Sequence, residues 1–119
     1  MTQHEVKVLL GDMRLAAADV RAFVKGKTFD EYRSDPLLQA AVERKFTILG
    51  EALVQALRLE PTLRKRIPNA SQVIAYRNRL VHVYSDINPK IAWSFVENHL
   101  AALEARLDAL IAESERCGS

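Results

Sequence analysis

Apolar residues recur every three or four positions along most of this chain, and this periodicity constrains the fold more than any other feature. One such run extends from Val6 to Phe23, and a second extends from Val42 to Leu57. This spacing places the apolar side chains on one face of an α-helix, where they can be buried together. Clusters of β-branched and aromatic residues, which are typical of strands, are sparse. The pattern therefore predicts an all-α fold.

Capping signals divide the chain into helices joined by short turns. Thr28 and Glu31 form a capping box, Asp35 precedes a proline at the start of a long helix, and Asn88 does the same for the last one. Asn69 or Ser71 caps the helix between them. About five helices are expected, over residues 3–25, 28–33, 35–60, 69–84 and 88–113. They predict an antiparallel up-and-down bundle in one domain, residues 1–119, with about 113–119 as a flexible tail.

Length and composition fit an ordinary globular domain. The 119 residues are enough to bury an apolar core, and 49% of them are hydrophobic and 27% charged. Cys117 is the one cysteine, so it cannot form an internal disulfide. The sequence shows neither a signal peptide nor an apolar stretch long enough to span a bilayer. We expect a cytoplasmic protein that has no membrane association and no cofactor.

Gly50 lies inside the longest predicted helix. A glycine there costs about 1 kcal/mol of stability relative to alanine. A close approach by another helix would explain the glycine, and so would sequence drift.

The predicted helix over residues 69–84 carries polar groups on an otherwise apolar face. Arg77 shares one stripe with Val73 and Leu80, and Asn78 lies beside it, with His82 one turn further on. Burying a guanidinium costs several kcal/mol unless it is paired, so a reaction site is one explanation for this pattern. Arg77 and His82 differ by about 140° around the helix axis. They converge only at a frayed end, in a groove or across a second subunit.

Arginine and histidine together favour chemistry at a phosphate. The guanidinium of Arg77 matches phosphate oxygens, and the imidazole of His82 can transfer a proton near neutral pH. No carboxylate cluster, cysteine pair or glycine-rich loop accompanies them, which indicates metal-independent cleavage of RNA, whose own 2′-hydroxyl is the nucleophile. One histidine cannot conveniently be both base and acid. A homodimer would supply two copies of His82 at its two-fold axis.

Other interpretations fit the same residues. His82 can be a packed histidine and Arg77 the donor of an interhelical salt bridge, because their spacing alone is not specific. The segment from Arg58 to Arg79 carries six basic residues against one acid, Glu60. This excess suits a polyanion or an acidic partner, and it would also serve a binding subunit that has no catalytic activity. A charge-balanced, solvated face explains it equally well. A third hypothesis is that the helical bundle only assembles into a structural dimer.

The segment Arg77-Asn78-Arg79-Leu80-Val81-His82-Val83-Tyr84 resembles the R-N-x-x-x-H-x-Y signature of HEPN-domain proteins, and specifically of HepT-like toxins. Three further blocks, at residues 29–32, 41–44 and 48–52, look like segments of that family. The blocks occur in the family's order, and the resemblance spans about residues 5–110.

The resemblance implies a helical-bundle ribonuclease toxin of a type II- or type VII-like toxin–antitoxin system, acting as a homodimer. Arg77 and His82 would line its cleft, with Asn78 in support. It also implies an MntA-type nucleotidyltransferase antitoxin that transfers AMP to Tyr84. Glu51 matches the family pattern as well, and either serves the site or pairs with a base inside the bundle. The alternative is a non-catalytic HEPN subunit that binds a nucleotide or a nucleotidyltransferase.

Overall fold

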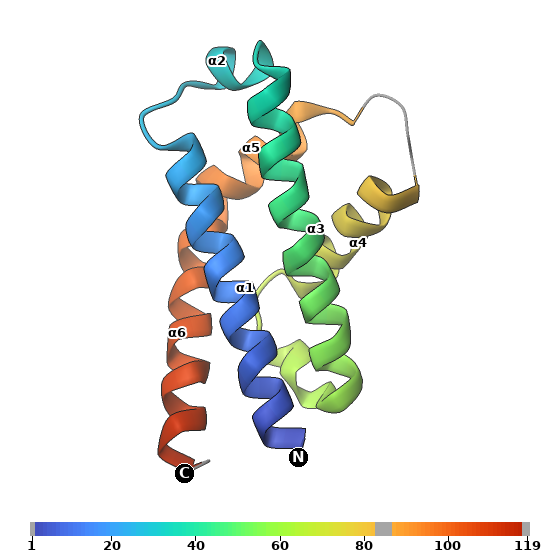
Figure 1. Cartoon of the computed structure of the whole chain (residues 1–119), viewed down its shortest axis with the longest axis vertical. Helices are drawn as coiled ribbons and strands as arrows, with labels where there is room; N and C mark the ends of the chain where they lie inside the picture. The colour runs from blue at the N-terminus through green and yellow to red at the C-terminus, as the bar shows by residue number, and fades with distance from the viewer. Residues whose placement is uncertain (1, 83–86, 118–119) are drawn as a thin grey trace.

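The computed structural model describes residues 2–82 and 87–117, and this part of the chain contains helices and no strand, as predicted (Figure 1). The α-helices are α1 (Thr2–Val24), α2 (Phe29–Arg33), α3 (Pro36–Leu59), α4 (Ala70–His82), α5 (Pro89–Asn98) and α6 (Leu100–Cys117). A 3-10 helix, Pro61–Lys65, leads from α3 toward α4.

Three long helices form the body of the bundle. Helix α1 packs along both α3 and α6 and runs antiparallel to them, so both ends of the chain lie at the same end of the molecule (Figure 1). Helix α4 packs on α3 and lies outside this body, while α5 contacts α2, α3 and α6. The antiparallel bundle predicted from the sequence is confirmed. Its candidate functional helix, α4, is a side element with one extensive neighbour.

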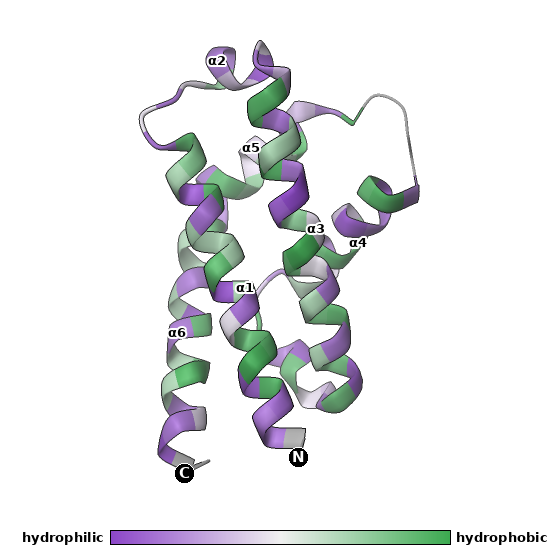
Figure 2. Cartoon of the chain, viewed as in Figure 1, coloured by the Kyte–Doolittle hydropathy of each residue, from purple (hydrophilic) through white to green (hydrophobic). Residues whose placement is uncertain are grey.

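The predicted apolar stripes make up the core. In Figure 2 hydrophobic and hydrophilic residues alternate along each long helix, as expected for amphipathic helices. Most stripe residues are buried, while Leu9 and Phe23 are only partly covered. On the last helix, Leu107 is buried and the neighbouring Arg106 is exposed. The buried stripe residues are Val6, Met13, Ala16, Val20, Val42, Phe46, Leu49, Leu53, Ala56, Val73, Ala92, Leu103, Leu107 and Leu110.

The predicted caps of three helices are present. Thr28 and Glu31 form the capping box of α2, with both reciprocal hydrogen bonds. Asp35 accepts a hydrogen bond from the backbone N–H of Leu38 at the start of α3. Asn88 caps α5. These side chains satisfy backbone donors that the helix itself leaves unpaired.

The last predicted helix, over residues 88–113, is divided in two. His99 leaves helical geometry at φ −133° and ends α5, and its N–H donates to the carbonyl of Phe95 at 2.8 Å. Helix α6 then begins at Leu100 and continues to Cys117, beyond the end expected near Glu113. The break lets α5 pack on α2 and α3 while α6 turns to pack on α1.

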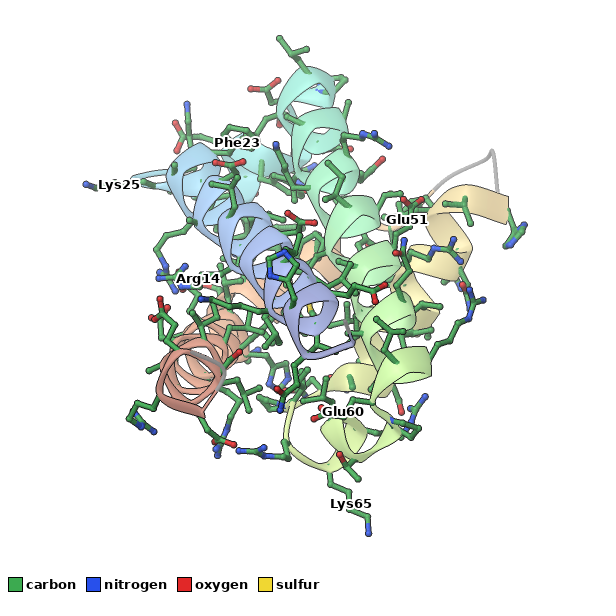
Figure 3. All side chains as sticks on the ribbon, turned by 60° about the horizontal axis from the view of Figure 1, so that its bottom comes forward. Arg14, Phe23, Lys25, Glu51, Glu60 and Lys65 are labelled. Atoms are coloured by element: carbon green, nitrogen blue, oxygen red, sulfur yellow. The ribbon has the colours of Figure 1, made fainter. Side chains whose placement is uncertain are left out.

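Ion pairs fasten α6 to its neighbours. The buried carboxylate of Glu104 pairs with both Arg14 and Arg21 of α1, and Glu113 pairs with Arg66 (Arg14 is labelled in Figure 3). The acids of the last helix therefore neutralise α1 and the 3-10 region rather than α4. None of the described helices is both long and apolar enough to cross a membrane.

Candidate active site on helix α4

Helix α4 begins at a tight turn and ends at the candidate histidine. Asn69 precedes it with a φ of 61°, in the left-handed region that asparagine tolerates better than most residues. Its carbonyl accepts the N–H of Val73 at 3.0 Å, and its side chain donates to Gln72. Asn69 therefore lies directly before α4, at one of the two positions expected for its cap, but its side chain bonds Gln72 and not a backbone N–H. Buried Val73 and Tyr76 then fix the rotation of α4 against the bundle.

Gly50 of α3 is the point of closest approach to Arg77 of α4. A Cβ atom placed on Gly50 would lie 2.4 Å from Cβ and 2.7 Å from Cγ of Arg77, and 3.6 Å from the carbonyl oxygen of Val73. Real Cβ atoms essentially never come that close to another carbon, so only glycine fits here without a shift. Of the two explanations for this helical glycine, the structure supports close approach of another helix.

The guanidinium of Arg77 is held loosely at the surface of this junction. Its Nη1 donates to Oδ1 of Asn78 at 2.9 Å, and Nη2 lies 4.0 Å from Oε1 of Glu51. Figure 3 shows Glu51 on the side of α3 that is nearer α4. Nε of Arg77 is buried and has no hydrogen-bond partner within residues 2–82 and 87–117. With a side chain still 26% exposed, Arg77 keeps donor capacity for an anion.

Glu51 of α3 lies beside the guanidinium of Arg77. Its side chain is 44% exposed, and its Oε1 lies at the outer limit of an ion pair with Nη2 of Arg77. An anion bound to Nη2 of Arg77 would compete with this contact, because it would use the same donor. The interhelical salt bridge considered for Arg77 thus exists only as a long contact.

His82 is exposed at the last position of α4, so it is not a packed core histidine. No hydrogen bond of its side chain to any residue in the described part of the chain is present. Arg77, five residues earlier, leans on α3 instead. An offset of five residues also separates the two positions by about 7.5 Å along the helix axis. Within one chain, the structure does not join the two side chains by a hydrogen bond.

The two other residues predicted for the site are Asn78 and Tyr84. Asn78, expected to support the site, is exposed and accepts the hydrogen bond from Arg77 described above. Tyr84 lies outside the described residues, so its place relative to Arg77 and His82 stays a prediction.

A buried polar cluster beside α4 was missed by the sequence analysis. The hydroxyls of Tyr32 and Tyr76 are buried, and neither has a hydrogen-bond partner among the described residues. Burial raises the pKa of Tyr76 far above its usual range, and nearby Tyr32 and Glu43 raise it further. Burial also raises the pKa of Glu43. The tyrosine spacing gave no signal of this cluster, because its members come from α2, α3 and α4.

The described residues contain no group of three or more His, Cys, Asp or Glu side chains arranged to hold a metal ion. The chemistry that this site can offer from its own side chains is anion binding by Arg77 and proton transfer by His82.

Comparison with known proteins places this chain in a family. The chain matches the family model described as Ribonuclease HepT-like over residues 13–110. It is 26% identical to a protein of Methanocaldococcus jannaschii named as a candidate RNase, over 91% of this chain and 98% of the other. A second candidate RNase of that organism is 27% identical over 97% and 94% of the two chains.

A candidate RNase of Caldanaerobacter subterraneus subsp. tengcongensis is 26% identical over 74% of this chain and 78% of its own. No solved structure matches the chain at a significant level. The family match covers most of the chain, including α3, α4 and the junction between Gly50 and Arg77. The chain belongs to the HepT-like ribonuclease family.

Proposed function

We propose that this protein is the toxin of a toxin–antitoxin pair and cleaves RNA without a metal ion, at a site built from Arg77 and His82 of two protomers. The 2′-hydroxyl of the substrate attacks the adjacent phosphorus as one His82 takes its proton. The P–O5′ bond breaks, and the second His82 protonates the leaving 5′ oxygen. The products are a 2′,3′-cyclic phosphate and a 5′-hydroxyl end. Arg77 stabilises the negative charge on the phosphorane.

The observation that carries this proposal is the environment of the Arg77 side chain. Gly50 makes room for the side chain, and Asn78 holds one end of the guanidinium. Glu51 stays at the edge of ion-pair distance. An arginine that only stabilises the fold would be expected to have a close carboxylate, as Glu104 provides for Arg14 and Arg21. Arg77 is less exposed than either, yet its one carboxylate contact among the described residues is Glu51 at 4.0 Å, in a protein of a ribonuclease family.

The second protomer follows from the placement of His82. It is exposed at the end of α4, and a single copy offers one histidine where the reaction needs both a base and an acid. Two copies related by a two-fold axis near the end of α4 would supply both groups. Light scattering of the purified protein should then give the mass of a dimer, and a monomeric mass at the concentrations that support cleavage would count against the composite site.

Cleavage itself is tested with purified protein and total RNA in EDTA. We expect His82→Ala and Arg77→Ala each to lose at least about 100-fold in rate, the usual scale for a positioned acid–base group or charge stabiliser. His4→Ala and Arg44→Ala are matched controls, since His4 and Arg44 are exposed on α1 and α3, and both should cleave normally. Equal cleavage by all five proteins would end the proposal.

We also propose that a nucleotidyltransferase antitoxin silences the toxin by transferring AMP to Tyr84. The chain has three tyrosines, and the other two, Tyr32 and Tyr76, are only 1% and 7% exposed. An added phosphate near Arg77 and His82 would repel RNA. Mass spectrometry of toxin co-expressed with the nucleotidyltransferase should find AMP on Tyr84, and Tyr84→Phe should arrest growth in spite of the antitoxin. Neutralisation of an unmodified Tyr84→Phe protein would indicate steric inhibition instead.

A further inference from the structure

An open groove of about 480 Å³ lies between α4 and α5. Its floor is apolar and is formed by Phe46 of α3, Tyr76 of α4 and Phe95 of α5, whose rings meet edge to face around Phe46 at 5.5 Å between centroids. Ile91 on its α5 side is 37% exposed, one of the few large apolar side chains left open to solvent. Groove volume and lining are those of a small-molecule or nucleobase site.

The rim of the groove is basic. Arg79 projects from α4 and Lys90 from α5, and both are exposed. Neither side chain forms an ion pair within the described part of the chain, whereas Arg14, Arg21 and Arg66 are all paired. No aspartate or glutamate occurs among the described residues that line the groove. An apolar floor under two unpaired cations is complementary to a ligand that joins a flat apolar ring to an anion.

The groove adjoins the proposed site along one edge of α4. Ala75 and Arg79 line the groove, and His82 continues the same row at spacings of four and three residues. Residues at such spacings are neighbours on a helix surface. A ring in the groove would therefore leave its anion beside Arg79, one helical turn from the imidazole of His82.

We infer that the groove is a subsite for one unpaired nucleotide of the RNA, next to the cleaved bond. Its base enters between α4 and α5, and Arg79 and Lys90 hold its phosphate. Bases splayed out of single strands are recognised by such apolar recesses beside cations. The inference rests on the proposed RNA cleavage, and it adds a preference for single-stranded substrate.

Binding is measured in a His82→Ala background, so that no RNA is consumed. Fluorescence anisotropy would measure the binding of a short, labelled single-stranded RNA. The same measurement is repeated with a series of RNAs, each of which has one abasic nucleotide at a different position. Ala75→Leu fills the groove from its α4 edge. Ala101→Leu is the matched control, because Ala101 is also exposed, on α6, and does not line the groove.

We expect Ala75→Leu to weaken binding of the intact RNA about tenfold, the scale of one lost base contact, and Ala101→Leu to bind normally. At one position of the RNA, the abasic change should weaken binding to the parent protein by a similar factor. The same abasic RNA should bind Ala75→Leu as well as the intact RNA does. Arg79→Gln should lower the slope of log affinity against log salt by about 0.7, the value for one phosphate of a single strand, while Arg44→Gln leaves it unchanged.

Normal binding of intact RNA by Ala75→Leu would overturn the inference, as would an abasic penalty that persists in that variant. A change of oligomeric mass in Ala75→Leu by light scattering would also overturn it, since the groove would then hold a second copy of the chain. If the wild type binds RNA in this manner but never cleaves it, the proposed catalysis fails and the subsite stands. If it cleaves RNA and Ala75→Leu is normal, the subsite alone fails.

Discussion

The substitution Gly50→Ala tests whether the junction of α3 and α4 positions Arg77. The added methyl would lie 2.4 Å and 2.7 Å from two carbons of Arg77. Ordinary carbon contacts lie at about 3.5–4.0 Å, so Arg77 or the whole of α4 has to move by about 1 Å. Neither atom is the free end of a flexible side chain, because Cβ and Cγ are tied to the α4 backbone. A displacement of about 1 Å at a catalytic group costs about 100-fold in rate.

Stability should change far less than activity. Alanine in place of glycine inside a helix gains about 1 kcal/mol. Overpacking a close contact costs about 1–3 kcal/mol. The two effects oppose each other, so we expect Gly50→Ala to destabilise the protein by about 0–2 kcal/mol. A folded protein with strongly reduced cleavage is the expected result.

Gly11 provides the matched control. It lies in α1, and a Cβ there would meet nothing within 4 Å. Gly11→Ala should therefore stabilise by about 1 kcal/mol and leave cleavage unchanged. Urea unfolding followed by circular dichroism gives the stabilities, and cleavage of a labelled RNA gives the rates. If Gly50→Ala stabilises as much as Gly11→Ala and cleaves at the wild-type rate, the proposed role of the junction is refuted.

A double-mutant cycle separates this contact from a general effect on α3. In an Arg77→Gly background the methyl of Gly50→Ala loses both close contacts, and the next nearest atom, the carbonyl oxygen of Val73, lies at an ordinary 3.6 Å. The same substitution should then stabilise by about 1 kcal/mol rather than destabilise. An unchanged penalty in that background would show that the strain arises elsewhere.

Three further predictions concern charged residues. Arg77→Lys keeps the charge but loses the planar fork that bonds Asn78, so cleavage should fall about tenfold or more in the EDTA assay, and a wild-type rate would mean that charge alone suffices. Glu104→Gln weakens the partly buried pairs with Arg14 and Arg21, and urea unfolding should show a loss of about 1–3 kcal/mol with normal cleavage; no loss would mean that these pairs do not stabilise the bundle. Burial raises the pKa of Glu43, so its ionised form costs stability above that pKa and the cost disappears as pH falls through it. The melting temperature of Glu43→Gln should therefore be higher than that of the wild type at neutral pH and equal to it below about pH 4. A difference that does not depend on pH would exclude burial of the ionised carboxylate as its cause.

Local signals in the sequence were sufficient to predict most helix boundaries. Thr28, Asp35 and Asn88 act on backbone groups within three residues of themselves, so their effect does not depend on the rest of the fold. The break at His99 carries no such signal, since neither proline nor glycine is nearby. It arises because α5 and α6 pack on different helices, which is a tertiary effect.

The candidate site shows the same division. Its signature at Arg77 and His82 is contiguous and could be recognised, and Gly50 could be noticed as unusual within a helix. Their connection could not be predicted, because Gly50 and Arg77 are 27 positions apart and meet only when α4 docks on α3. The groove was missed for a similar reason. Its floor combines side chains from three helices, each of which looks like an ordinary core residue in its own segment.

The packing of α4 supports the proposal that its two candidate catalytic residues act together with a second copy of the chain. A helix that docks on one neighbour must turn its buried face toward that neighbour, and Arg77 lies at the edge of this face because Gly50 admits it. His82 is about 140° further around the axis and therefore points away from α3. A rotation of α4 that turned His82 toward α3 would expel Val73 and Tyr76 from the core. This geometry supports the proposed composite site, in which a second protomer brings its own Arg77 or His82 to the same phosphate.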